Sequence, residues 1–198
     1  MPERLSVARV REALAGRARS VVEGPHVARR AAVAAIVRAG EGGGAEILFI
    51  KRAEHPEDPW SGHMAFPGGR VDPGDAGLVE AALRETREEI GLDLPRHGEA
   101  IGALDDLPAI GRGARDGLVV TPFVFALSSL PALSLDPTEV DEVRWAPLAP
   151  LMAGERDATF DYEWRGLPMR FPAYRVGPRV VWGMTYRMLQ LLFERLRG

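Results

Sequence analysis

Apolar residues recur along the chain in short runs typical of strands and at wider spacings typical of helices. Residues 31–38 and 47–52 are rich in small, β-branched and apolar side chains, and the glycine-rich residues 40–44 lie between them. This order predicts a β-hairpin. Further apolar runs, which predict strands, occupy residues 101–104, 118–127 and 140–145.

Helical spacing occurs in three parts of the chain. Near the N-terminus, apolar residues among charges predict a short amphipathic helix that ends at Gly16. Residues 78–90 predict a second helix, which Gly91 closes as a C-terminal stop. Residues 182–196 predict the last helix. Its expected buried side is formed by Met188, Leu189, Leu192 and Leu196.

The aromatic-bearing residues 158–181 lie on both sides of Arg165 and Gly166 and predict a second hairpin. Strands and helices interleave along the chain without a regular β-α-β order. This favours an α/β fold of the α+β type, with a mixed sheet sandwiched between helices, an additional hairpin and an N-terminal helix. We find no internal repeat and no low-complexity segment.

The composition excludes several classes of function. The net charge of −3 gives no basic surface for a nucleic-acid backbone, so we expect no nucleic-acid partner. The absence of cysteine excludes disulfides, thiolate catalysis and zinc–thiolate sites. No apolar run approaches the roughly 20 residues of a transmembrane helix, and residues 1–16 lack the apolar core of a signal peptide. We therefore expect a cytoplasmic protein without a membrane partner.

The predicted helix 78–90 carries three glutamates on one side. Glu85, Glu88 and Glu89 stand at positions i, i+3 and i+4, which share one face of a helix. Like charges so close together repel unless a positive group lies among them. Hard divalent cations such as Mg²⁺ bind oxygen ligands of this kind together with substrate phosphates. The spacing therefore indicates a metal site for phosphate chemistry.

The same segment resembles the signature of the Nudix hydrolases. Gly69 and the run 84–92 match it, while Asp75 stands in place of the usual glutamate. Eight residues rather than seven separate Asp75 from Arg84, and Thr86 replaces the usual apolar residue. The first two departures fall where the helix begins, so we expect them to alter a helix cap rather than the metal-binding face.

The resemblance implies a role for each matching residue. Glu85, Glu88 and Glu89 would bind Mg²⁺, for which Mn²⁺ can substitute, with help from the carbonyl group of Gly68. Arg84 would orient and neutralise Glu88. Gly68 and Gly69 would allow the backbone to come close to the ligand. The implied reaction is the hydrolysis of a nucleoside diphosphate that is linked to another group.

The sequence does not decide between two candidates for the general base, or whether a side-chain base is needed at all. In many members of the family it is a glutamate outside the signature, on a loop that faces the metal ions. Glu139 and Glu142, at the beginning of the predicted strand 140–145, are the candidates. Two alternatives remain: both residues are exposed charges at the edge of a strand, or a metal-bound water needs no separate side-chain base.

Further stretches resemble the coenzyme A diphosphatase branch of the family. The segments that carry this resemblance are residues 62–69, 81–85, 89–91, 120–122 and 181–185, within a region from about 31 to 195. The branch motif is matched by Arg52-Ala53 and Gly62, but Asp58 stands where an arginine is expected. This motif is also one residue longer here. Arg52, His55 or Arg70 could supply the missing positive charge to a phosphate.

The branch resemblance implies that coenzyme A or a derivative is cleaved to 3′,5′-ADP and 4′-phosphopantetheine. The alternatives are ADP-ribose, a dinucleoside polyphosphate or a nucleoside triphosphate, and a Nudix module that senses a nucleotide without cleaving it. Trp145 and Trp182 could stack on an adenine, although we expect them to pack in the core. We assign residues 1–24 to an N-terminal helical arm and 25–198 to the Nudix domain, and the resemblance allows a homodimer.

Overall fold

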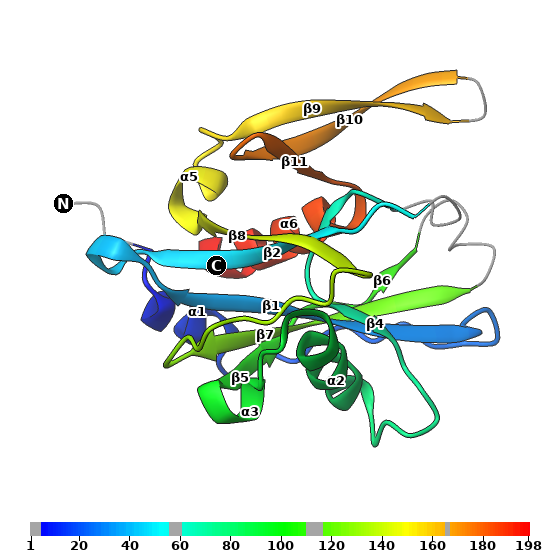
Figure 1. Ribbon diagram of the computed structural model, residues 1–198, viewed down its shortest axis with the longest axis horizontal. Coiled ribbons are helices and arrows are strands. Elements are labelled where there is room, and N and C mark those ends of the chain that lie inside the picture. The colour runs from blue at the N-terminus through cyan, green and yellow to red at the C-terminus, as the bar shows by residue number, and fades with distance from the viewer. Residues whose placement is uncertain (1–4, 56–60, 110–116, 165–166) are drawn as a thin grey trace.

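The computed structural model describes residues 5–55, 61–109, 117–164 and 167–198. An eight-stranded mixed sheet forms its centre (Figure 1), with the main strand order β3-β2-β1-β7-β5. Its strands are β1 Arg29–Ala39, β2 Ala45–Arg52, β3 Met64–Ala65, β4 Gly68–Arg70, β5 Gly98–Ala103, β6 Leu107–Pro108, β7 Leu118–Leu127 and β8 Val140–Pro147.

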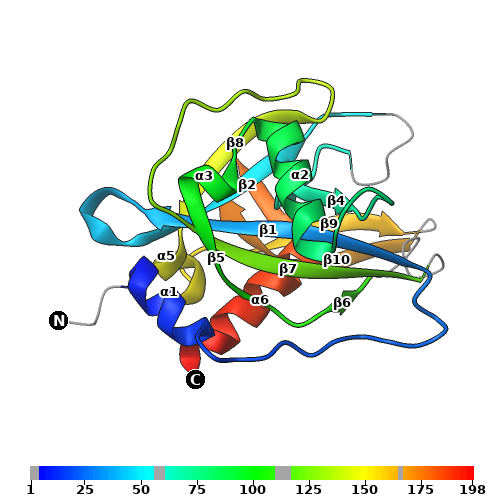
Figure 2. The same cartoon turned by 90° about the horizontal axis from the view of Figure 1, so that it is seen from below.

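Helices lie on both sides of this sheet, and the two views in Figures 1 and 2 show α2 and α3 on the side opposite α6. The helices are α1 Val7–Leu14, α2 Leu78–Ile90, α3 Leu94–His97, α5 Leu148–Met152 and α6 Gly183–Arg197, with a 3₁₀ turn η1 at Glu41–Gly43. The predicted mixed sheet between helices is confirmed. In the described part of the chain, no helix has both the length and the apolar character that crossing a membrane requires.

The apolar strand β2 contributes side chains to two hydrophobic clusters, one on each face of the sheet. Ile47 and Phe49 pack into the cluster that contains α6, whereas Leu48 and Ile50 pack into the cluster beneath α2. All four side chains are fully buried. Because side chains alternate along a strand, a strand covered on both faces must be apolar throughout.

The main sheet splits at β1, and this split shapes the region where α2 lies. β1 pairs with β4 at Ala31–Val33 but with β2 at Val37–Ala39, both antiparallel, so β2 and β4 diverge from a common strand. β1 also pairs in parallel with β7. At the beginning of β4, a Cβ on Gly68 would lie 2.3 Å from the Ala32 carbonyl oxygen, and its φ is 143°. Only glycine allows this approach.

A second sheet has the order β11-β10-β9, with β9 at Asp157–Trp164, β10 at Leu167–Val176 and β11 at Arg179–Trp182. The predicted hairpin 158–181 is confirmed as β9 and β10, and β11 extends it to a third strand. Both predicted helices at the two ends of the chain are confirmed. The sequence did not indicate α3, α5 or β6, because elements of two to five residues are too short to show a periodicity.

The N-terminal segment is fixed to the domain rather than separate from it. Val10 and Leu14 of α1 are buried in the core cluster that α6 also joins. The segment after α1 contacts the buried carboxylate of Asp106. Four groups donate hydrogen bonds to this carboxylate, the side chains of Arg19, Arg30 and Thr121 and the backbone N–H of Val22. The division into residues 1–24 and 25–198 stays a prediction.

We predict that Asp106→Asn lowers the free energy of unfolding by about 3 kcal/mol, because it leaves partly buried donors without a charged acceptor. Burial raises the pKa of Asp106, but the hydrogen bonds from Thr121, Val22 and Arg30 lower it below its ordinary value. The stabilisation is therefore complete at neutral pH and lost as the pH falls through the folded-state pKa.

Urea unfolding at pH 7 and at successively lower pH values would measure this difference. Asp161→Asn is the matched control, because Asp161 also pairs with an arginine, Arg170, but both side chains are more than 65% exposed. The control variant should change stability by no more than ~0.5 kcal/mol. Equal losses in the two variants would contradict the anchoring role of Asp106.

Candidate active site

The helix α2 presents its glutamates in a fixed frame. Gly91 adopts the left-handed conformation, with φ 68°, and its N–H donates to the Arg87 carbonyl, which ends the helix as predicted. Thr86 is fully buried, and its hydroxyl donates to the Ala82 carbonyl at 2.7 Å. This backbone bond satisfies the hydroxyl, so a threonine fits the apolar position of the signature.

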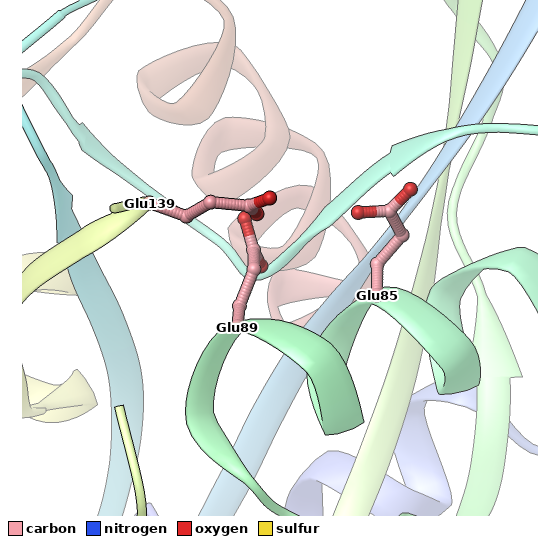
Figure 3. Close-up of side chains that lie close together, drawn as sticks. All are labelled: Glu85, Glu89 and Glu139. Atoms are coloured by element: carbon pink, nitrogen blue, oxygen red, sulfur yellow. The ribbon is translucent and has the colours of Figure 1, made fainter. Parts of the chain in front are cut away.

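Three carboxylates from two parts of the chain meet beside α2 (Figure 3). One oxygen from each of Glu85, Glu89 and Glu139 lies within 4.8 Å of the others. Glu89 is 1% exposed, Glu85 is half-buried and Glu139 is exposed. Glu139 comes from the segment just before β8, on the opposite side of the group from α2.

The glycines of β4 form one wall of this group. The N–H of Gly68 donates to Glu89 Oε2 at 2.9 Å. A Cβ on Gly69 would lie 2.5 Å from the Glu85 carboxylate. A side chain at position 68 would clash with the backbone of β1, and one at position 69 would displace the Glu85 carboxylate, so glycine at both positions lets β4 lie this close to the carboxylates.

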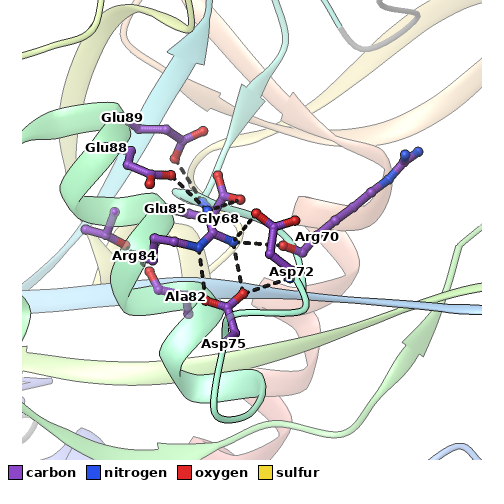
Figure 4. A network of polar contacts seen from close by, with 10 residues as sticks. Gly68, Arg70, Asp72, Asp75, Ala82, Arg84, Glu85, Glu88 and Glu89 are labelled. Carbon is purple, nitrogen blue, oxygen red and sulfur yellow. Dashed lines mark hydrogen bonds and ion pairs between the residues drawn. The ribbon is translucent and has the colours of Figure 1, made fainter.

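Arg84 connects the helix to the loop before it (Figure 4). Its Nε and Nη2 bind the two carboxylate oxygens of Asp75, each at 3.0 Å. Its Nη1 donates to Glu85 at 3.0 Å and to Glu88 at 2.8 Å. The hydrogen bond from the Arg84 side chain has the larger effect, and together with the one from the Asp72 backbone N–H it holds the pKa of Asp75 below its ordinary value. The same pairing with Asp75 raises the pKa of Arg84.

Two further predicted site residues, Glu88 and Glu142, do not join the group of three carboxylates. Glu88 is exposed and contacts Arg84, and it lies outside the group of three carboxylates. Glu142 forms ion pairs with Arg144 and with Arg179, and it too lies outside the group. The predictions that Glu88 binds metal and that Glu142 is a base stay predictions.

The two predicted phosphate-binding arginines are placed differently. The positive charge of Arg52 acts on Glu89 and favours its ionised form. The side chain of Arg70 is exposed and extends away from the carboxylates in Figure 4, while its backbone carbonyl accepts a hydrogen bond from Arg84 at 3.1 Å. Asp58 and its neighbours 56–60 lie outside the described residues.

Burial and mutual repulsion control the charge of the group. Burial raises the pKa of Glu89 to about 8, and Glu85 and Glu139 add to this effect, while the Gly68 N–H and Arg52 oppose it. Burial also raises the pKa of Glu85, against the influence of Arg84. A carboxylate that burial makes costly to ionise gains most from a nearby cation. The three oxygen donors fit a divalent metal ion such as Mg²⁺.

A family model described as NUDIX domain matches residues 28–165. A Schizosaccharomyces pombe protein is 40% identical over 111 residues, which are 55% of this chain and 34% of that protein. The mitochondrial coenzyme A diphosphatase NUDT8 of Homo sapiens is 32% identical over 154 residues, which are 76% of this chain and 62% of that protein. The chain thus spans less than two thirds of the length of either relative.

The fold is also found among solved structures. The crystal structure of a MutT/nudix family protein from Enterococcus faecalis superimposes with a TM-score of 0.57 at 17% identity. The match covers 89% of this chain and 63% of that one. At this identity, the likeness concerns the fold alone, and it agrees with the fold class that the sequence predicts.

We predict that Glu89→Gln stabilises the metal-free protein in a pH-dependent way. The folded-state pKa of about 8 lies above the ordinary value of 4.5. Below pH 4.5 the Glu89 carboxyl is neutral in both the folded and the unfolded state, so the variant and the wild type should be equally stable there. As the pH rises from 4.5 to 8, the unfolded state ionises while burial keeps Glu89 protonated in the folded state, which destabilises the wild type by up to ~5 kcal/mol.

Thermal unfolding in EDTA at pH 4 and at pH 9 would measure this effect. The melting temperature of Glu89→Gln should exceed that of the wild type at pH 9 and match it at pH 4. Glu88→Gln is the control, because Glu88 is 55% exposed. A difference between Glu89→Gln and wild type that does not change with pH would contradict the burial argument.

Proposed function

The chain belongs to the Nudix family, and on this basis we propose that it hydrolyses a phosphoanhydride bond in a nucleoside diphosphate linked to another group. The single observation that carries this proposal is the meeting of Glu85, Glu89 and Glu139 beside the glycines of β4. Three hard oxygen donors in one place match the needs of phosphate chemistry, which requires charge to be neutralised around the reacting phosphorus.

In this proposal Glu85 and Glu89 would hold Mg²⁺ or Mn²⁺, with Glu88 as the further ligand from the same helix face. When bound there, the ion withdraws negative charge from the diphosphate and makes water a better nucleophile. Arg84 orients the helix carboxylates through its bonds to Glu85 and Glu88. The Gly68 N–H fixes the carboxylate of Glu89.

We assign the general base to Glu139 rather than to Glu142. The carboxylate of Glu139 is exposed and belongs to the group of three, so it can accept a proton from water that attacks there. The carboxylate of Glu142 is held by Arg144 and Arg179. Glu142 is thus directed toward these two arginines and lies outside the group of three carboxylates.

Coenzyme A is the proposed substrate. Two observations support it, the 32% identity to the human coenzyme A diphosphatase NUDT8 and the branch motif at Arg52-Ala53 and Gly62. Asp58 in place of an arginine favours a second candidate, a nucleotide without the extra 3′-phosphate such as ADP-ribose. Because the carboxylates are present, a purely sensing module has less support. The cytoplasmic location and the homodimer stay predictions.

We predict that Glu139→Gln lowers kcat at least ~100-fold while the fold is retained, because it removes both a charge and a proton acceptor from the site. Glu142→Gln should stay within about threefold of the wild type. Rates measured from pH 6 to pH 10 with saturating Mg²⁺, together with circular dichroism of both variants, would check this. The reverse order of the two losses would assign the base to Glu142.

A substrate screen tests the function itself. We expect coenzyme A to yield 3′,5′-ADP and 4′-phosphopantetheine with Mg²⁺ or Mn²⁺, and no product in EDTA. ADP-ribose, NADH, dinucleoside polyphosphates and nucleoside triphosphates are tested in parallel, with products identified by chromatography. Cleavage of ADP-ribose with coenzyme A untouched would replace the proposed substrate. Cleavage that continues undiminished in EDTA would refute the metal-dependent mechanism.

A further inference from the structure

One face of the second sheet carries a row of aromatic side chains. In the register of β9 and β10, Phe160 stands opposite Phe171 and Tyr162 stands opposite Met169. Trp182 of β11 stands beside Ala173 on the same face. Because side chains alternate across a strand, the even-numbered residues of β10 point to the opposite face of the sheet. That opposite face includes Tyr174, which is buried in the core.

The aromatic rings contact one another around Trp182. The ring of Phe160 is stacked on it, with centroids 4.4 Å apart and planes 26° apart. Tyr162 and Phe171 lie at 5.2 Å and 5.4 Å, and His63 meets the tryptophan edge-on at 5.0 Å. These five residues, His63, Phe160, Tyr162, Phe171 and Trp182, are called the aromatic platform below.

The platform is only partly covered by the rest of the protein. All five of its side chains are intermediate in exposure. Along the same face of β10, Met169 is 42% exposed and Leu167 is 65% exposed. A row of rings that served packing alone would be covered, as Tyr174 is on the other face with 3% exposure. The platform therefore offers an apolar surface to a ligand.

The platform adjoins the candidate active site through His63. The carbonyl of His63 accepts a hydrogen bond from the Arg52 N–H at 3.0 Å, and the charge of Arg52 acts on Glu89. The backbone N–H of Ala53, the residue after Arg52, donates to the carbonyl of Glu139 at 2.8 Å. Gly68 follows His63 by five positions, a span of at most ~17 Å when extended. One small-molecule substrate can therefore contact the carboxylates and the platform together.

We propose that the aromatic platform binds the nucleobase of the substrate by stacking, and this inference rests on the proposed function. A base presents a flat π-face, which the rings of Phe160 and Tyr162 match and a flexible aliphatic arm does not. Stacking also tolerates different bases. The platform thus fixes the end of the substrate that carries the base, and the carboxylates act on its diphosphate.

AMP and ribose 5-phosphate form the matched pair of probes, because they differ only in the base. Titration calorimetry with Mg²⁺ would compare the wild type with Phe160→Ala and Tyr162→Ala. Both positions lie on β9, at the edge of its sheet, and Trp182 is kept intact. We expect AMP to bind about 10-fold more weakly to each variant. Ribose 5-phosphate should bind all three proteins equally within twofold.

Trp145→Phe is the control variant, because Trp145 is the other candidate for stacking and lies under Arg38, 4.1 Å from its guanidinium carbon. AMP affinity should not change in this variant. For any adenine nucleotide that is hydrolysed, KM should rise in Phe160→Ala and Tyr162→Ala while kcat stays within threefold.

Three results would overturn the proposal: AMP that does not bind the wild type, equal AMP affinity in all proteins, and loss of AMP binding in Trp145→Phe alone. Weaker binding of 4′-phosphopantetheine, with AMP binding unchanged, would instead assign the platform to the other half of the substrate. None of these titrations depends on turnover, so a failure of hydrolysis in the substrate screen is a separate result.

Discussion

The burial of one carboxylate beside two others is the constraint on which the site depends. Glu89 is almost completely covered, and its neighbours Glu85 and Glu139 carry the same charge. The Gly68 N–H stabilises the ionised form, but burial and repulsion still raise the pKa of Glu89 to about 8. Such an arrangement is costly in a protein without a cation and becomes favourable when a cation binds. The metal-free protein is therefore less stable, and the site has a higher affinity for a cation.

The backbone of β4 makes that burial geometrically possible. Gly68 packs against the Ala32 carbonyl of β1, and Gly69 packs against the Glu85 carboxylate. Neither contact leaves room for a side chain. The same strand lies where β2 and β4 diverge from β1, and its glycines lie beside the glutamates of α2. Gly68 therefore serves the pairing of β4 with β1, and Gly69 leaves room for the Glu85 carboxylate.

Arg84 shows how a departure from the family pattern is accommodated. Aspartate has one methylene fewer than glutamate, yet Asp75 receives two bonds from Arg84, each at 3.0 Å. The additional residue between them gives the loop more length for the shorter side chain to reach the guanidinium. Such a planar two-point pair fixes direction as well as distance. Arg84 keeps a third nitrogen for Glu85 and Glu88, so the departure changes the entry to the helix and leaves the carboxylates of α2 in place.

The sequence by itself determined the long elements and the carboxylates of α2, because periodicity and the i, i+3, i+4 spacing are local properties. It also supplied Glu139 and Glu142 as equal candidates. Only the tertiary structure separated them, since the pairing of β8 with β2 turns Glu142 toward Arg144 and Arg179, while Glu139 reaches Glu89. The aromatic platform and the anchor at Asp106 also join residues far apart in the chain. Contacts of this kind depend on how sheets and helices pack, which no local pattern records.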